Sequence, residues 1–373
     1  MQLRCRQRIA TAGIVGVAMA LTLAACSSSS TTTASGGSTA TGATSAPAGG
    51  ATSSGAALSG TLNGSGSTFQ LTFQQAAIQA FKSVQSGMTV NYGGGGSGKG
   101  RTDLSSGVVQ YAGSDSTIPS SEEANFKGKT VLYFPVVIGP ITLSYNLSGV
   151  SDLKLDPTVI ADIFDGKITT WNDPAIKAIN SGANLPSQPI KLAVRSDSSG
   201  TTANFSNFLV MSAGSAWSLG TSSTINWPKT AQAGNGNGGV AQIVKSTPGA
   251  IGYVDFADAK AAGLTYASVK NKAGSFVAPS TSAATTACEN ATLKPDVTFS
   301  CLWTPGAGSY PITYQSWDLV FQSQSSTNTA AMLKAYIGYL IGDGQKLLPS
   351  LNYAPLPSNI QQQAQAQLSK IGS

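Results

Sequence analysis

Three short segments rich in glycine, serine and threonine contain the groups in this chain that are best suited to chemistry. They are Gly64–Phe69, Gly93–Gly98 and Arg195–Thr201, and each stands where a strand should give way to a helix or a loop. At such a junction the first N–H groups of a helix have no internal partner, and the helix dipole adds positive potential. Glycine lets the backbone approach a ligand closely, and hydroxyls add donors. Together the segments predict a site for a small anion, although each alone also fits an N-cap or an ordinary turn.

Catalysis is disfavoured by what the composition lacks. The chain has no histidine, which excludes the usual catalytic triads and nearly all zinc sites except those made only of thiolates. The stretch Gly93–Lys99 approaches a nucleotide-binding P-loop, but Gly100 stands where a serine or threonine should hold magnesium. We therefore expect no catalytic residue, no cofactor and no metal, and we disfavour a secreted phosphatase with Ser97 or Ser199 as nucleophile.

The charge pattern gives no sign of a nucleic-acid partner. The formal net charge is +6, and it falls to +3 when Arg4, Arg6 and Arg8 are removed with the leader that we expect. No cluster of lysine and arginine follows in the rest of the chain. A DNA- or RNA-binding protein needs such a basic footprint, so we expect no nucleic acid to bind.

The N-terminus indicates export and attachment to a membrane. Residues 1–25 carry three arginines and then an apolar run, which is typical of a secretory signal peptide, although an uncleaved anchor also fits. The segment Leu23–Cys26 resembles the lipobox of bacterial lipoproteins, which implies that Cys26 is lipidated. Residues 26–58 are almost entirely Ser, Thr, Gly and Ala and predict a flexible tether. We thus expect a protein anchored to the outer face of the cytoplasmic membrane.

The elements that must position the three segments follow the tether. From Gly60 onward short β-rich runs alternate with helical stretches, which predicts an α/β fold with a largely parallel sheet. The hydrophobic periodicity predicts strands over 88–92, 190–194 and 251–254, and helices over 71–81, 240–244, 330–341 and 360–371. A further helix containing Phe205 and Phe208 should follow the polar turn Arg195–Gly200.

Two cysteines lie close together in the second half of the chain. Cys288 and Cys301 flank a stretch rich in asparagine and threonine, and outside the cytoplasm such a pair predicts a structural disulfide. Cys5 should be removed with the signal peptide. A redox-active pair is disfavoured because nothing resembles a Cys-x-x-Cys motif.

A series of motifs makes the chain similar to a known family. The motifs run in order from Gly64 to about Pro357: GSGSTF, NYGGGGSGKG, GSDSTI, FPVVIGPITLSYN, IFDGKITTWNDPAI, VRSDSSGTT, STINWP and PGAIGYV. Together they resemble the periplasmic phosphate-binding proteins that serve the high-affinity ABC phosphate importer. The resemblance implies a two-lobe α/β substrate-binding fold, with a hinge of crossover segments near Val136–Gly139 and Tyr310–Thr313. The first lobe would comprise residues 59–137 and 311–373, and the second lobe residues 138–310.

The resemblance also implies which residues hold the ligand. Donors from both lobes would surround a phosphate ion, and Asp197 would hold the Arg195 guanidinium in place. The residues that match the family's phosphate-binding positions are Thr68, Phe69, Ser97, Asp115, Arg195, Ser199, Gly200 and Thr201. An exposed salt bridge between Arg195 and Asp197 is the alternative. The four consecutive glycines and Lys99 depart from the family's pattern, which leaves the geometry of that loop open.

Asp115 bears on the choice of ligand. A carboxylate can accept a hydrogen bond from a protonated phosphate, whereas sulfate has no proton to donate and would face an unpaired charge. Asp115 could instead cap a turn. We expect a monomer that captures inorganic phosphate by closure and delivers it to the ABC permease in the membrane. The alternatives are a receptor for sulfate or molybdate and a lipid-anchored phosphate sensor.

Overall fold

The computed structural model describes residues 58–289 and 291–373. The predicted signal peptide, the lipidation of Cys26 and nearly all of the predicted tether therefore lie outside the described residues. No helix within the described ranges has both the length and the apolar character needed to cross a bilayer.

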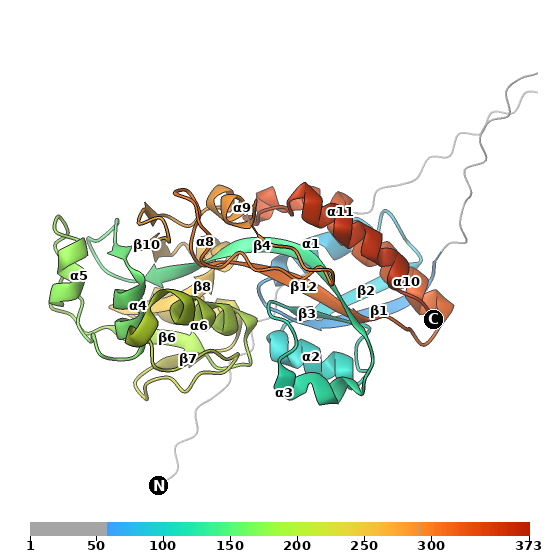
Figure 1. Cartoon of the computed structure of the whole chain (residues 1–373), viewed down its shortest axis with the longest axis horizontal. Helices are drawn as coiled ribbons and strands as arrows, with labels where there is room; N and C mark the ends of the chain where they lie inside the picture. Colours follow the sequence, from blue (N-terminus) through green and yellow to red (C-terminus); the bar gives the residue numbers. More distant parts are fainter. Residues whose placement is uncertain (1–57, 290) are drawn as a thin grey trace, which may run out of the picture. The chain divides into compact units, whose positions relative to one another are not determined.

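A mixed sheet of nine strands forms the centre of the described part of the chain (Figure 1). A short ninth strand, β9 (Thr265–Tyr266), pairs with β4 outside the main path. The main path runs, in order, through β2 (Met88–Gly93), β1 (Gly60–Gly66), β3 (Tyr111–Ser114), β12 (Thr313–Phe321), β4 (Val131–Tyr145), β8 (Ala250–Asp255), β6 (Lys191–Arg195) and β7 (Gln232–Gly234). A second, three-stranded sheet contains β5 (Lys154–Leu155), β10 (Ser268–Lys270) and β11 (Phe276–Val277).

The long strand β4 belongs to both halves of the main sheet. Residues 131–140 of β4 pair with β12, whereas residues 141–145 pair with β8. We call the part from β2 to β12 the first half and the part from β8 to β7 the second half. The predicted crossover Val136–Gly139 lies inside β4, and the other, Tyr310–Thr313, leads into β12. The lobe boundaries given above stay a prediction.

The expectation of a largely parallel sheet is wrong in the middle of the sheet. The flanks are parallel, since β1 pairs in parallel with β2 and β3, and β6 pairs in parallel with β7 and β8. The central pairs of β12 with β3 and β4, and of β4 with β8, are antiparallel. The reason is that β12 enters the sheet between β3 and β4 and runs opposite to both, and that β4 in turn runs opposite to β8.

Helices cover the faces of the sheet, and most of the predicted ones are confirmed. The last predicted helix is too long, because α11 ends at Gln367 and a 3₁₀ turn follows over Leu368–Lys370. The helices are α1 (Leu71–Phe81), α2 (Ser97–Ser105), α3 (Ser120–Glu123), α4 (Pro157–Phe164), α5 (Pro174–Ile179), α6 (Gly200–Ser212), α7 (Gly236–Ser246), α8 (Phe256–Ala262), α9 (Thr281–Glu289), α10 (Thr327–Ile341) and α11 (Ser358–Gln367). Further 3₁₀ turns cover Ala124–Phe126, Gly214–Ala216, Asp343–Leu347 and Pro349–Leu351.

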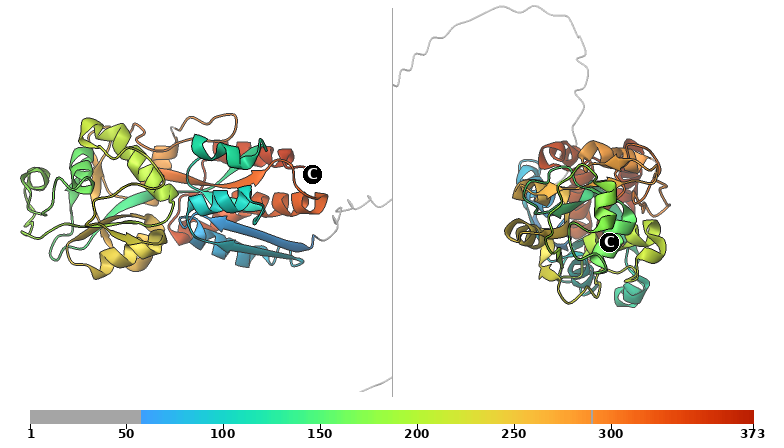
Figure 2. Two further views of the ribbon diagram at one scale, coloured as in Figure 1. Left: turned by 90° about the horizontal axis from the view of Figure 1, so that it is seen from below. Right: turned by 90° about the vertical axis from the view of Figure 1, so that its left-hand side faces the viewer.

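The two ends of the described chain pack together. In the left view of Figure 2 the blue N-terminal strands and the red C-terminal helices both lie in the right-hand half of the ribbon. Phe73, Ala77 and Phe81 are buried on the inner face of α1, as the helical spacing predicts. Phe81 packs edge-on against Tyr336 of α10, with 5.2 Å between ring centroids. This packing fixes α1, and with it the segment between β1 and α1.

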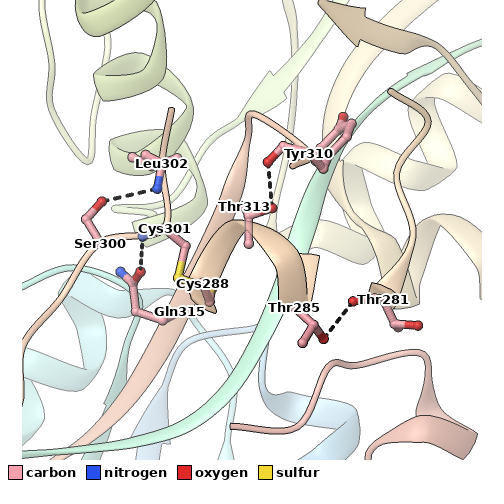
Figure 3. The surroundings of a disulfide bond; sticks show 9 residues. All are labelled: Thr281, Thr285, Cys288, Ser300, Cys301, Leu302, Tyr310, Thr313 and Gln315. Carbon is pink, nitrogen blue, oxygen red and sulfur yellow. Dashed lines mark hydrogen bonds between the residues drawn. A yellow bond between two sulfur atoms is a disulfide. The ribbon is translucent and has the colours of Figure 1, made fainter. Parts of the chain in front are cut away.

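The predicted disulfide between Cys288 and Cys301 is confirmed (Figure 3). It joins the end of α9 to the segment that precedes β12, and both cysteines are buried. The N–H of Cys301 donates to Oε1 of Gln315 on β12 at 3.3 Å. The disulfide thus ties the end of α9 to this segment, and the hydrogen bond to Gln315 ties the segment to β12.

Removing the disulfide should lower stability without affecting the anion site. The two cysteines are 13 residues apart, and by loop-closure entropy a ring of this size contributes about 3 kcal/mol. We expect the double variant Cys288→Ser/Cys301→Ser to lose about that much free energy of unfolding, as measured by denaturant titration. The wild-type protein with its disulfide reduced should match the variant. An unchanged unfolding midpoint in both samples would contradict this expectation.

Candidate functional site

Four helix N-termini meet where parallel strands end. β1 leads into α1, β2 into α2, β6 into α6 and β7 into α7, so each helix begins just beyond the carboxyl end of a strand. This edge of an open α/β sheet is where ligands usually bind, because the unpaired N–H groups of the helices face outward there. The sequence indicated three of these junctions. It missed the fourth, at Asn235–Asn237, where asparagines and no hydroxyl residues accompany the glycine.

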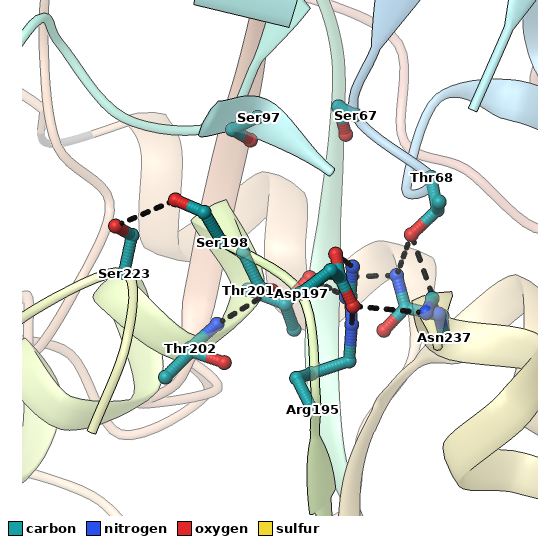
Figure 4. Close-up of polar contacts among 12 residues, drawn as sticks. Ser67, Thr68, Ser97, Arg195, Asp197, Ser198, Thr201, Thr202, Ser223 and Asn237 are labelled. Atoms are coloured by element: carbon teal, nitrogen blue, oxygen red, sulfur yellow. Dashed lines mark hydrogen bonds and ion pairs between the residues drawn. The ribbon is translucent and has the colours of Figure 1, made fainter. Parts of the chain in front are cut away.

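Direct hydrogen bonds join the two halves of the sheet around these junctions. The N–H of Gly98 donates to the carbonyl of Ser198 at 2.9 Å. Nδ2 of Asn204 on α6 donates to the carbonyl of Asp115 at 2.7 Å. Figure 4 shows Asn237 beside Thr68, whose Oγ1 accepts from the N–H and Nδ2 of Asn237 at 3.3 and 3.2 Å. The loops that end β1, β2 and β3 are therefore in contact with those that begin α6 and α7.

The glycine-rich loop is shaped by this contact. A Cβ on Gly96 would lie 2.2 Å from Oδ2 of Asp197, and φ is +91° there. A Cβ on Gly98 would lie 2.1 Å from Oγ of Ser198. Any side chain at either position would push the halves apart, which is a physical reason for the glycine run. Lys99 points away from the site, because its ammonium group pairs with Asp103 and its side chain is half exposed.

Arg195 is held at the end of β6 by a buried ion pair. Its Nε donates to Oδ1 of Asp197 at 2.8 Å, and its second terminal nitrogen donates to Oδ2 at 2.5 Å. The remaining terminal nitrogen donates to Oγ1 of Thr201 at 3.2 Å. The side chains of Arg195 and Asp197 are only 1% and 7% exposed, which excludes the exposed salt bridge. Asp197 also accepts the N–H of Gly236 at 3.0 Å, so α7 helps to hold the pair.

The ion pair keeps both partners charged despite their burial. Burial opposes the charge on Arg195, but the bond to Asp197 outweighs it and raises the pKa of Arg195. For Asp197, burial again opposes the charge, and the bond to Arg195 outweighs it and lowers the pKa of Asp197. A bidentate pair with further hydrogen bonds is the arrangement in which a buried guanidinium is well compensated.

Asp115 lies just beyond β3, in a cage of serine hydroxyls. Its Oδ1 accepts from Oγ of Ser67 at 2.5 Å and from Oγ of Ser316 at 2.6 Å. Its Oδ2 has one weaker contact, with Oγ of Ser97 at 3.4 Å. Burial raises the pKa of Asp115, and the hydroxyls of Ser316 and Ser67 and the charge of Arg195 oppose that rise. The carboxylate caps no turn, since the hydrogen bonds that it accepts come from hydroxyls distant in sequence.

The remaining predicted residues lie beside these groups. Phe69 differs from expectation, because its N–H already donates to Oγ of Ser67 at 3.1 Å and its ring stacks on Tyr314 at 4.1 Å. Oγ of Ser199 caps α6 by accepting the N–H of Thr202 at 3.1 Å. The next two N–H groups, of Gly200 and Thr201, make no hydrogen bond within residues 58–289 and 291–373.

The arrangement of these groups therefore suits an anion that carries a proton. A buried guanidinium, two unpaired N–H groups at the start of α6 and several hydroxyls supply donors, while Asp115 supplies an acceptor. The residues missed by sequence reasoning are Ser67, Ser316, Asn204 and Asn237. Ser67 stands inside the GSGSTF motif, whereas the other three belong to no motif that we identified. Within the described ranges, no group of three or more side chains suited to bind a metal ion is found.

Comparisons with known proteins agree on one family. A family model described as the PBP superfamily domain matches residues 51–343. The chain is 34% identical over 310 residues to phosphate-binding protein PstS 3 of Mycobacterium leprae, covering 80% of this chain and 84% of that protein. It is also 34% identical over 313 residues to phosphate-binding protein PstS of Pasteurella multocida, covering 82% of this chain and 89% of that protein.

Solved structures share the fold. A high-affinity periplasmic phosphate-binding protein with phosphate bound superposes with a TM-score of 0.68 at 23% identity, covering 82% of this chain and 93% of that chain. A phosphate-binding protein from Stenotrophomonas maltophilia superposes with a TM-score of 0.62 at 18% identity, covering 83% of this chain and 94% of that chain. At these identities the likeness shows the architecture, a two-lobe α/β fold.

Proposed function

This chain belongs to the PBP superfamily and, within it, to the family of PstS phosphate-binding proteins, and from that membership we propose that it captures inorganic phosphate and delivers it to an ABC transporter permease. The proposed ligand residues are Thr68, Ser97, Asp115, Arg195, Ser199, Gly200 and Thr201. Phe69 is left out, because its N–H donates to Oγ of Ser67 and its carbonyl accepts the hydroxyl of Tyr353. The protein would act without catalysis, as a binding protein.

One observation carries the proposal. A buried arginine and the open N-terminus of α6 belong to the second half of the sheet, whereas Asp115 belongs to the first, and they lie together. Arg195 and the N–H groups of Gly200 and Thr201 would bind the ionised oxygens of phosphate. Oδ2 of Asp115 would accept the hydrogen bond of a P–OH group.

The proposed mechanism is capture by closure. A phosphate ion between the two halves would bond to donors on both, so it would bind the closed arrangement better than an open one and shift the population toward closure. β4 and the segment leading into β12 would form the hinge between lobes comprising residues 59–137 with 311–373 and residues 138–310. A monomer anchored through lipidated Cys26 to the outer face of the cytoplasmic membrane would present the closed form to the permease.

Selectivity is the sharpest test of the binding proposal. Calorimetric titration of the purified protein near neutral pH should show that phosphate binds, that arsenate competes and that sulfate does not bind. Asp115→Asn should lower the ratio of the phosphate affinity to the sulfate affinity by at least about tenfold, because the amide can donate a hydrogen bond to a fully ionised oxygen of sulfate. The exposed Asp152→Asn is the matched control and should behave as the wild type. Sulfate binding to the wild type as tightly as phosphate would overturn the proposal.

Delivery to a permease is tested separately, in cells. Deletion of the gene should lower phosphate uptake at low external phosphate, and the intact gene should restore it. Unchanged uptake, with phosphate binding intact in the purified protein, would favour a phosphate sensor over a transport protein.

A further inference from the structure

The two hydroxyls that bind Asp115 have fixed orientations. Oγ of Ser67 accepts the N–H of Phe69 at 3.1 Å, and Oγ of Ser316 accepts Nε2 of Gln70 at 3.1 Å. A hydroxyl has one proton, and a lone pair engaged by an N–H donor turns that proton to the opposite side. Both protons therefore point at Oδ1 of Asp115, at 2.5 and 2.6 Å between oxygens. Oδ1 can act only as an acceptor in this arrangement.

The orientation of Gln70 is itself fixed from deeper in the core. Its Oε1 accepts from Nε2 of Gln74 at 2.8 Å, so its Nε2 must face Ser316. Gln74 is oriented in turn, because its Nε2 donates to Oδ2 of Asp318 at 3.0 Å and its Oε1 accepts the hydroxyl of Tyr336 at 2.7 Å. A chain of hydrogen bonds thus runs from α10 through α1 to β12 and ends at the candidate anion site.

Local geometry explains how so few residues make this chain. Gln70 and Gln74 are four residues apart at the start of α1, so their side chains lie on the same face of the helix. Ser316 and Asp318 are two residues apart on β12, so their side chains lie on the same face of the sheet. All four residues are fully buried, which leaves no bulk water to replace a missing partner.

We propose that Ser316, oriented by Gln70, is a positioning residue that determines which oxyanions bind, because it commits one oxygen of Asp115 to the protein and leaves the other to accept a proton from the ligand. This inference rests on the proposed function, since it concerns how the same site selects phosphate. Asp115 makes contact with the ligand in this scheme, whereas Ser316 acts only through Asp115. No motif in the sequence points to Ser316, which lies 201 residues from Asp115.

The direction of the expected effect follows from the groups around Asp115. Burial raises the pKa of Asp115, and the Ser316 hydroxyl is the strongest of the opposing influences. Without that hydroxyl the carboxyl should take up a proton at higher pH.

The other titratable groups facing Asp115 are Arg195 from β6, Tyr92 from β2, Tyr314 from β12 and Tyr353. Burial raises the pKa of all three tyrosines, so they stay neutral. Asp318, which accepts a hydrogen bond from Gln74, has its pKa raised by burial to about 7.

Sulfate is the probe that separates this role from a purely structural one. It carries no proton over the range of pH 4 to pH 8, so it should bind only when Oδ2 of Asp115 carries a proton to donate. The sulfate affinity of the wild type should rise as the pH falls through the pKa of Asp115. For Ser316→Ala this rise should occur about one pH unit higher, the shift that one lost hydrogen bond to a carboxylate produces.

Matched variants make the test decisive. Ser316→Thr retains a hydroxyl on the strand and should restore the wild-type profile. Ser144→Ala removes another fully buried strand hydroxyl, which lies 2.7 Å from Thr142 in the second half, and should leave the profile unchanged. Gln70→Leu releases the Ser316 hydroxyl and should shift the profile in the same direction. If circular dichroism shows that Ser316→Ala does not fold, the sulfate profile of Gln70→Leu takes its place: a shift to higher pH supports the inference, and an unshifted profile overturns it.

The outcomes distinguish this inference from the proposed function. A shifted sulfate profile in Ser316→Ala, with wild-type behaviour in Ser144→Ala, supports the inference. A profile that coincides with the wild type, while phosphate still binds, overturns it and leaves phosphate binding intact. Failure of the wild-type protein to bind phosphate overturns the proposed function and this inference with it.

Discussion

Gly200→Ala should weaken phosphate binding by about 100-fold or more while the protein stays folded. A Cβ at this position would lie 2.4 Å from Oγ of Ser97 and 2.7 Å from Oδ2 of Asp115, both on the first half of the sheet. Real Cβ atoms do not approach so closely, so the two halves must separate. A closed form held apart by a methyl group loses the simultaneous contacts on which capture depends.

The expected stability of this variant separates a blocked closure from misfolding. Gly200 is the first residue of α6, and alanine is a better helix former than glycine, so the unliganded protein should unfold at the same or higher denaturant concentration. Gly238→Ala on α7 is the matched control, because a Cβ there meets nothing within 4 Å. Calorimetry and denaturant titration are both needed. Near-wild-type affinity for phosphate in Gly200→Ala would show that the ligand does not require this close approach.

Arg195→Met should weaken phosphate binding by about 100-fold to 1,000-fold, the effect of removing one partner of a buried, hydrogen-bonded charge pair. The guanidinium is buried and already oriented by Asp197, so little entropy is lost when it binds an anion. The same substitution should also lower the free energy of unfolding, because Asp197 is left as a buried charge without its partner. Calorimetric affinity and denaturant titration measure the two effects.

A double variant separates the two effects. Arg195→Met/Asp197→Asn removes both charges, so it should recover much of the lost stability and none of the lost affinity. Lys99→Met removes a half-exposed cation that pairs with Asp103, and it should change phosphate affinity little. If the double variant bound phosphate within tenfold of the wild type, Arg195 would have no direct role in holding the ligand.

The parts of the site that could be predicted from sequence have local signals. A strand followed by glycine and hydroxyl residues and then by a helix is visible within about ten residues, and this pattern marked the segments Gly64–Phe69, Gly93–Gly98 and Arg195–Thr201. The helix of α1 was equally clear from the spacing of Phe73, Ala77 and Phe81. In each case the residues that specify the structure are neighbours along the chain.

The parts that could not be predicted depend on strand order. Ser316 approaches Asp115 because β12 lies between β3 and β4, and nothing near residue 316 in the sequence specifies that position. Asn237 reaches Thr68 only across the two halves of the sheet. The antiparallel centre was missed for the same reason, since alternating strands and helices indicate parallel pairing unless the return of β12 is known. The packed ring of Phe69 shows that even a matched motif residue can serve mainly the core.

The position of β12 in the middle of the sheet has a consequence for biogenesis. A nascent chain that has grown only as far as residue 312 contains all of β3 and β4, but the strand that must lie between them has not yet emerged. Until it does, these backbone edges lack their partner and can join other chains instead. Completion of the first half of the sheet must therefore wait until β12 has emerged, and a chaperone that holds the unfinished polypeptide would protect it during that delay.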